Sequence, residues 1–377
     1  MRVAALSIAG AALACSSPRP STDHSEPSKG VPVSPPPTTA APALRWERVT
    51  PDHGLGAAVR PPAFAAVLGH RMFVALADAH NAASLFAAGA DGVPGAVGAI
   101  PIVATGLCAA GDHLVVTGAR VRDARPVVLE VDTSGKVILE LELPIAGALH
   151  RAAQPVCTSA GVRVVWEERG PGNASTLMWS ELAGAALGPV HSHTWPDRTV
   201  GFAPAADGSR VILLRDGGHP AHSLLHRFGG GDPEQTLPLP AFAVANPVGA
   251  ADRAAVLLVP EPQTLQLAMV EPTGALGARL TVLGVSAPRT IDGGLLISGE
   301  RGVLTVAVAS GGEDPASETP TGEPVRREDY TLVACDAQAA GPAQPIEQPL
   351  AGAWLDGRLV LWTGRAGAVV STWRLVQ

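Results

Sequence analysis

Lysine is almost absent from this chain. Of its 27 basic residues only Lys29 and Lys136 are lysines, and the formal net charge of the 377 residues is −7. A protein that binds nucleic acids without sequence preference needs a basic surface to neutralise phosphates. The charge balance therefore excludes a general nucleic-acid-binding role.

The motifs of the common enzyme and cofactor classes are also absent. The chain contains no Gly-x-Ser-x-Gly, His-Glu-x-x-His or Cys-x-x-Cys sequence. His219, His222 and His226 are closely spaced, but His222 and His226 fall on a predicted strand, about 13 Å apart. That separation is too large for both to bind one metal ion. The sequence thus predicts no cofactor and no metal site.

No long apolar run is present at the N-terminus. Val3–Leu13 has eleven residues, whereas a membrane-spanning helix needs about 20. Ala14-Cys15-Ser16-Ser17 follows directly, and the whole segment resembles a bacterial lipoprotein signal peptide. The resemblance implies that residues 1–14 are removed and that Cys15 is lipid-modified, while Ser16 implies outer-membrane sorting. The alternative is an ordinary secretory signal cleaved nearby.

Residues 15–43 have the composition of a linker. They include Pro-Pro-Pro at 35–37 and many Ser, Thr and Ala, with few large apolar residues. Such a segment cannot bury enough surface to fold. We expect a disordered tether that holds the following domain, residues 44–377, away from a membrane.

From Leu44 onward the chain repeats one strand–turn–strand unit seven times, at intervals of about 50 residues. A Val/Leu/Ile-rich strand follows a turn that usually carries Gly or Asp. These strands are Arg71–Asp78, His113–Arg120, Val162–Glu168, Arg210–Arg215, Arg253–Pro260, Val303–Ser310 and Arg358–Gly364. Their partner strands are Ala83–Ala88, Pro126–Asp132, Ser175–Leu182, His222–Phe228, Thr264–Glu271, Tyr330–Asp336 and Ala368–Val376.

Small, apolar strands such as Gln154–Ser159 precede these hairpins, and a more variable fourth strand follows them. Four strands per unit resemble the blades of a β-propeller, in which neighbouring blades bury both faces of each sheet. The last unit ends after its third strand, and Leu44–Val49 is left over at the other end. We therefore predict an all-β propeller of seven four-stranded blades, closed by this N-terminal strand. The alternative is a pair of β-sandwiches.

Polar residues gather in the loops between the second and third strands, which share one rim of a propeller. Function usually resides on loops over a rigid scaffold. The longest such loop is expected at Gly311–Asp329. The candidate binding residues on this rim are His80, Arg122, Arg125, Glu167, Arg169, Asp216 and His219. Glu167 and Glu168 are poor candidates for a catalytic pair, because adjacent side chains on a strand point to opposite faces.

Three cysteines remain besides Cys15. Cys108 and Cys157 occupy similar positions in the inner strands of consecutive units. A disulfide is compatible with an oxidising compartment, and two buried free thiols are the alternative. The sequence alone leaves this choice open, and Cys335 has no partner in either case.

These features together predict a lipid-anchored protein of the bacterial cell envelope, periplasmic or surface-exposed. Its propeller is expected to bind a protein or a glycan through the polar rim, without catalysis. The alternative is a propeller-type enzyme, such as a glycan hydrolase or lyase, with a central pocket.

Overall fold

The computed structural model is all-β. It describes residues 44–55, 60–169, 174–195, 202–207, 210–216, 223–228, 235–250, 253–271, 273, 275–287, 289–299, 302–318, 324–336, 338–364 and 367–376. Residues 1–43, which contain the predicted signal peptide, Cys15 and the linker, lie outside this set. Within the described residues, no helix is both long and apolar enough to cross a membrane.

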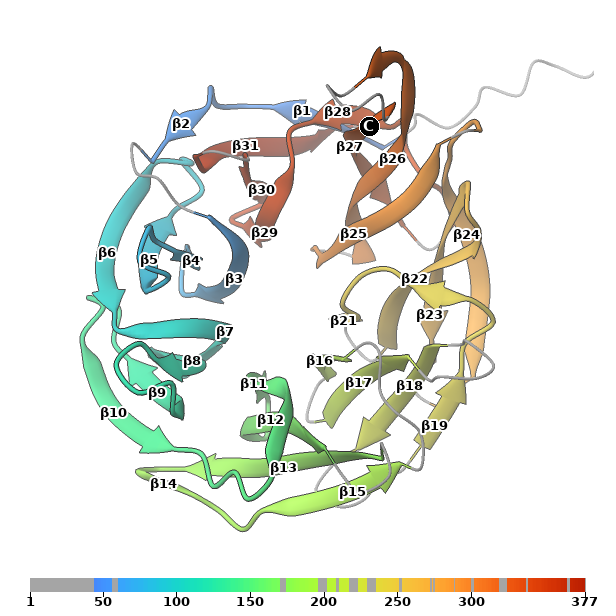
Figure 1. Ribbon diagram of the computed structural model, residues 1–377. Coiled ribbons are helices and arrows are strands. Elements are labelled where there is room, and N and C mark those ends of the chain that lie inside the picture. The colour runs from blue at the N-terminus through green and yellow to red at the C-terminus, as the bar shows by residue number, and fades with distance from the viewer. Residues whose placement is uncertain are drawn as a thin grey trace, which may run out of the picture. The chain divides into compact units, whose positions relative to one another are not determined.

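Seven antiparallel sheets stand in a ring around a central axis (Figure 1), which confirms the predicted seven-bladed β-propeller. Blade 1 comprises β3 (Arg60–Leu68), β4 (Arg71–Ala77), β5 (Ala83–Ala88) and β6 (Pro94–Ile100). Blade 2 comprises β7 (Ile102–Ala110), β8 (His113–Arg120), β9 (Pro126–Val131) and β10 (Val137–Glu142). Blade 3 comprises β11 (Ala148–Thr158), β12 (Gly161–Arg169), β13 (Ser175–Ala183) and an outer strand in two pieces, β14 (Ala186–Leu187) and β15 (His191–Trp195).

The remaining blades follow the same order from the centre outward. Blade 4 comprises β16 (Phe202–Asp207), β17 (Arg210–Asp216), β18 (Ser223–Phe228) and β19 (Gln235–Pro238). Blade 5 comprises β20 (Phe242–Ala243) and β21 (Val248–Ala250), then β22 (Arg253–Glu261), β23 (Thr264–Val270) and β24 (Leu276–Gly284). Blade 6 comprises β25 (Thr290–Ser298), β26 (Leu304–Glu318), β27 (Pro324–Cys335) and β28 (Gln344–Ile346). Blade 7 comprises β29 (Pro349–Leu355), β30 (Arg358–Thr363) and β31 (Val369–Val376), with β1 (Arg45–Arg48) and β2 (His53–Gly54) outside them.

The N-terminal strand closes the ring, as predicted. β1 pairs with β31, with Arg45 opposite Val376 and Arg48 opposite Trp373. Gln344 of blade 6 also brackets the strand, since its side chain accepts a hydrogen bond from the Trp46 amide (3.0 Å) and donates one to the Trp46 carbonyl (2.6 Å). The first and last described segments of the domain are thereby joined in one sheet.

The core lies between blades, because alternate residues of each middle strand face opposite neighbours. On β4, Met72 and Val74 belong to an apolar cluster shared with blade 7. Phe73 and Ala75, one position along, belong to a cluster shared with blade 2. A blade strand therefore carries apolar residues on both faces, which explains its nearly continuous hydrophobic sequence.

Blades 2 and 3 are joined covalently by a disulfide between Cys108 and Cys157, whose Cα atoms are 5.7 Å apart. The inner strands approach closely here. A Cβ on Gly106 would lie 2.4 Å from Cδ of Pro155, and the Thr117 hydroxyl donates to the Ala153 carbonyl (2.8 Å). The structure thus selects the disulfide over two free thiols.

Cys335 is the free cysteine among the described residues, and it is fully buried in blade 6. Burial raises the pKa of its thiol to about 12, and Asp336 adds to the shift. Because a thiol reacts through its thiolate, Cys335 behaves as a small core residue.

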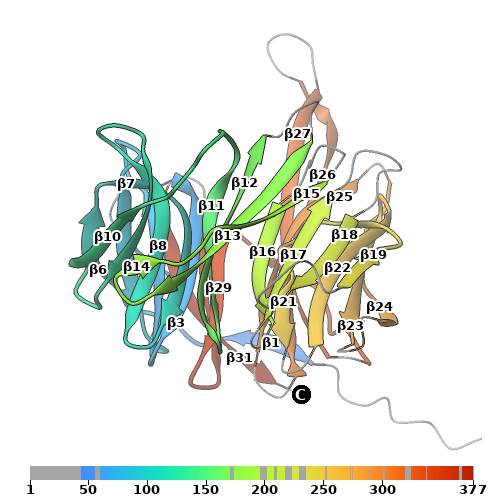
Figure 2. The same ribbon diagram turned by 90° about the horizontal axis from the view of Figure 1, so that it is seen from below.

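The expected loop at Gly311–Asp329 is for the most part a strand pair, so that prediction was wrong for its described residues, 311–318 and 324–329. There β26 and β27 are paired, with Gly312 opposite Arg327 and, after an irregularity beyond Asp314, Glu318 opposite Pro324. Figure 2 shows this hairpin projecting beyond the other blades. Gly311, Gly312 and Pro315 gave the sequence a loop-like composition, but the backbone pairing of β26 and β27 continues through Gly311 and Gly312.

Candidate functional site

The two rims of the propeller carry different connections. Because neighbouring strands of a blade are antiparallel, the second-to-third-strand loops and the blade-to-blade segments lie at one end. We call this end the loop rim. The opposite end, which carries the first-to-second and third-to-fourth turns, is the turn rim. The predicted binding residues that the structure describes come from the loop-rim ends of blades 1 to 4.

His80 lies on a tight turn of the loop rim in blade 1. The Asp78 carboxylate accepts hydrogen bonds from the backbone amides of His80 (2.7 Å) and Ala82 (3.0 Å). Asn81 has a φ of 64°, a left-handed conformation that asparagine tolerates well. The turn is therefore fixed by its own backbone, and the His80 side chain is exposed.

Blade 2 carries a network of ion pairs at the loop rim. The Arg120 side chain is mostly buried and donates to Glu140 (2.5 Å) and Glu142 (2.7 Å), both on the outer strand β10. Arg125 also donates to Glu142 (3.1 Å). The hydrogen bond from Arg120 lowers the pKa of Glu142 and raises that of Arg120. Glu142 therefore stays ionised at pH values at which an ordinary glutamate is already protonated.

The network supports two exposed guanidinium groups. The side chain of Arg122 is 76% exposed and that of Arg125 is 62% exposed. Asp123 lies between them, 3.7 Å from Nε of Arg122, and its pKa is lowered. Burial of Asp123 acts against this shift, but hydrogen bonds from the Arg125 amide and the Arg120 side chain outweigh it. Arg122 and Arg125 therefore lie close together, with their Nε atoms 3.7 and 4.0 Å from the same oxygen of Asp123.

The candidate binding residues chosen from the sequence did not include Arg120, Glu140 and Glu142. Glu140 and Glu142 alternate on an outer strand and are exposed, which is the ordinary pattern of a solvated face. In the folded sheet, Glu140 and Glu142 of β10 lie beside Arg120, the last residue of β8. The sequence of these strands does not show this contact.

Glu167 and Glu168 are both buried, on opposite faces of β12. Glu168 accepts hydrogen bonds from the Gly147 amide (2.8 Å), the Ala146 amide (3.4 Å) and the Trp166 indole (3.0 Å). It therefore fixes the segment between blades 2 and 3, which is a structural role.

Glu167 is only 1% exposed, so its side chain is not part of the accessible loop rim. It shares its face of β12 with Val165, which packs with Leu177 and Leu213 between blades 3 and 4. Neither carboxyl oxygen of Glu167 has a hydrogen-bond partner in the part of the chain that the structure describes. Burying such a group without a partner costs about 1–3 kcal/mol.

We expect opposite effects on stability when each glutamate is replaced by leucine. Glu167→Leu removes an unsatisfied buried group and should raise the free energy of unfolding by about 1–3 kcal/mol. Glu168→Leu leaves two backbone amides and the Trp166 indole without their hydrogen-bond acceptor. It should lower the free energy of unfolding by a similar amount. Urea unfolding of both variants beside the wild type measures the difference. Equal signs for the two changes would contradict this assignment.

The other predicted residues end two further strands at the loop rim. Arg169 is exposed at the end of β12. Asp216 ends β17, where it pairs with Ser223. His219 lies outside the described residues, so its place in the site remains a prediction.

Histidines elsewhere in blades 3 and 4 pack against aromatic rings. The buried ring of His226 lies 4.9 Å from that of Trp195 and contacts the Thr236 hydroxyl (3.0 Å). His191 stacks on Trp179, with 5.5 Å between ring centroids. Among the described residues, no group of three His, Cys, Asp or Glu side chains has the arrangement of a metal site.

Comparisons with known proteins identify the architecture only. No protein-family model matches the chain, and no curated protein matches it. Among solved structures, it is similar to BBS1N in complex with ARL6DN, with a TM-score of 0.55, 14% identity and coverage of 88% of this chain and 97% of the other. A chain of the mitotic checkpoint complex matches with a TM-score of 0.52, 12% identity and coverage of 96% and 99%.

The β-propeller domain of the Trilobed protease from Pyrococcus furiosus matches with a TM-score of 0.52 and 11% identity. The match covers 85% of this chain and 97% of that domain. At such low identity these likenesses establish the propeller fold and assign no activity.

Proposed function

We propose that this protein is a non-enzymatic binding scaffold that docks a partner protein on the loop rim. The observation that carries the proposal is the ion-pair network of blade 2, beside which Arg122 and Arg125 are exposed on the loop between β8 and β9. Arginine is enriched at protein interfaces. His80 and Arg169, on the neighbouring blades, extend the surface. Two of the similar propellers, BBS1N and the chain of the checkpoint complex, occur in protein complexes.

The rim is tested by reversing its charge. Arg122→Glu with Arg125→Glu should weaken binding of the partner at least about tenfold, since rim charges govern encounter and specificity. Lys136→Glu is the matched control, because Lys136 is an exposed cation in a third-to-fourth-strand turn on the turn rim.

The partner itself is identified by photo-crosslinking from positions 80, 122 and 169 in cells that make the protein, with position 136 as the negative control. The dissociation constant of the purified partner is then measured with the wild type, with the Arg122→Glu/Arg125→Glu variant and with the Lys136→Glu variant. Crosslinks confined to position 136, or equal affinities of the wild type and the double variant, would refute the proposal. Recovery of a glycan in place of a protein would also do so.

We further propose that the scaffold is a lipoprotein of the bacterial cell envelope, with a signal peptide at 1–14, a lipid on Cys15 and a tether at 15–43. The Cys108–Cys157 disulfide supports an oxidising compartment outside the cytoplasm.

Replacing Cys15 tests the anchor. Cys15→Ala should abolish incorporation of labelled palmitate and move the protein from the membrane fraction to the soluble fraction, because no lipid is then attached. Cys335→Ala, which alters a buried cysteine of the propeller, should leave the label in place. Unchanged labelling or membrane retention of the Cys15→Ala protein would contradict the proposal.

A further inference from the structure

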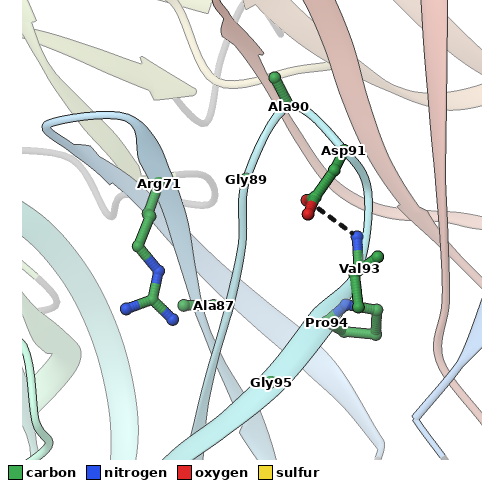
Figure 3. A pocket seen from close by; sticks show the side chains of 8 residues that line it. All are labelled: Arg71, Ala87, Gly89, Ala90, Asp91, Val93, Pro94 and Gly95. Carbon is green, nitrogen blue, oxygen red and sulfur yellow. Dashed lines mark hydrogen bonds between the residues drawn. The ribbon is translucent and has the colours of Figure 1, made fainter.

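A hollow of about 490 Å³ lies on the turn rim of blade 1 (Figure 3). Its volume falls in the range of small-molecule sites. Gly95 of β6 stands opposite Ala87 of β5, and a Cβ on Gly95 would meet only the Ala87 carbonyl oxygen, at 4.0 Å. The residues that line it are Arg71, Ala87, Gly89, Ala90, Asp91, Val93, Pro94 and Gly95.

The turn that walls this hollow is held from two sides. Within the turn, the Gly92 amide donates to the Gly89 carbonyl (3.0 Å). From blade 7, Arg358 donates to the Ala90 carbonyl (3.2 Å). Gly92 has a φ of 73°, and a Cβ there would meet the Thr372 side chain at 2.7 Å. The hollow is therefore shaped in advance, since the turn is tied to the next blade.

Arg71 places a positive charge at one side of the hollow. Its guanidinium lies 5.3 Å from the centroid of the buried Phe73 ring, which orients it. No carboxylate among the described residues lies within ion-pair distance of it. Arg253 occupies the same position at the start of the second strand in blade 5, and it pairs with Glu271 at 3.1 Å. The two positions differ in that Arg71 is available to an external anion.

Asp91 places a negative charge at the other side. One of its oxygens accepts the Val93 amide (3.2 Å), as Figure 3 shows. Its second oxygen has no donor in the described part of the chain. An arginine and an aspartate across a small hollow match a ligand with a carboxylate at one end and an ammonium group at the other.

We propose that this hollow binds a small zwitterion, a free α-amino acid or a short peptide. The ligand carboxylate pairs with Arg71 and the ligand ammonium group with Asp91. The open space over Gly95, which has no side chain, leaves room for the ligand body. This site lies on the rim opposite the proposed protein-binding surface. An experiment can therefore refute one of the two proposals without affecting the other.

The test uses L-alanyl-L-alanine as the probe in a saturation-transfer NMR titration of the full-length protein. Saturable binding is expected. Arg71→Gln and Asp91→Asn should each weaken it about tenfold or more, because each removes one charge-assisted contact. Arg253→Gln, the matched control, should bind as the wild type does. Unfolding midpoints of all three variants establish that they are folded.

The probe is varied in parallel. L-alanyl-L-alanine amide lacks the carboxylate and N-acetyl-L-alanyl-L-alanine lacks the ammonium group, so both should bind more weakly than the dipeptide. The proposal is overturned if the dipeptide shows no saturable binding, if Arg71→Gln binds it as tightly as the wild type does, or if the amide binds as well as the acid.

Discussion

Replacement of both Cys108 and Cys157 by alanine is expected to lower the free energy of unfolding by about 4 kcal/mol. The two cysteines are 49 residues apart in sequence, and a crosslink that closes a loop of this length removes much conformational freedom from the unfolded chain. The disulfide also joins the inner strands of two blades. Its loss weakens the contact between blades as well as each blade.

Guanidinium unfolding with and without a reducing agent measures this contribution. The wild type should lose stability on reduction and approach the double variant, whereas the double variant should not respond. Cys335 does not complicate the comparison, because it is present in both proteins. If the oxidised wild type and the double variant unfold at the same denaturant concentration, the disulfide does not form in solution.

The blades were predictable because each contains a strong local pattern. Strands such as Arg253–Pro260 are apolar and follow a short turn, and the pattern recurs seven times. The closing strand was predictable by counting, since the last unit lacked a fourth strand and Leu44–Val49 had no other partner. The blades depend on residues close together in sequence. The closing strand depends on the requirement that each blade have four strands.

The accessible surface was less predictable, because it depends on what lies beside each strand. Alternation placed Glu167 and Glu168 on opposite faces of β12, and the hydrogen bonds of Glu168 agree with this. In a propeller, however, both faces of a blade are covered by neighbouring blades. A charged residue at the end of a middle strand can therefore be buried, as Glu167 is.

The contacts of the candidate site were also beyond the sequence. Arg120 meets Glu142 from a strand two positions away in the sheet, and no pattern in either strand specifies that pair. The disulfide is a similar case, because the approach of two inner strands depends on Gly106 and on the packing of whole blades.

Trp46→Ala is expected to lower the free energy of unfolding by about 3–5 kcal/mol. Trp46 is only 2% exposed, and its ring centroid lies 5.2 Å from that of Trp354. It belongs to a core cluster with Ile297 of blade 6 and Leu361 of blade 7. Removal of the indole opens a cavity beside β1, the strand that closes the propeller. The first and last segments of the domain should therefore separate more easily.

The adjacent residue provides a matched control for this prediction. Glu47 is exposed on the other face of β1 and pairs with Arg374 at 2.7 Å. A surface ion pair of this kind contributes about 0–1 kcal/mol, so Glu47→Ala should unfold almost as the wild type does. Denaturant unfolding and limited proteolysis report the two effects, because an opened ring exposes β1 to cleavage. A Trp46→Ala protein as stable and protease-resistant as the Glu47→Ala protein would show that the N-terminal strand does not close the propeller in solution.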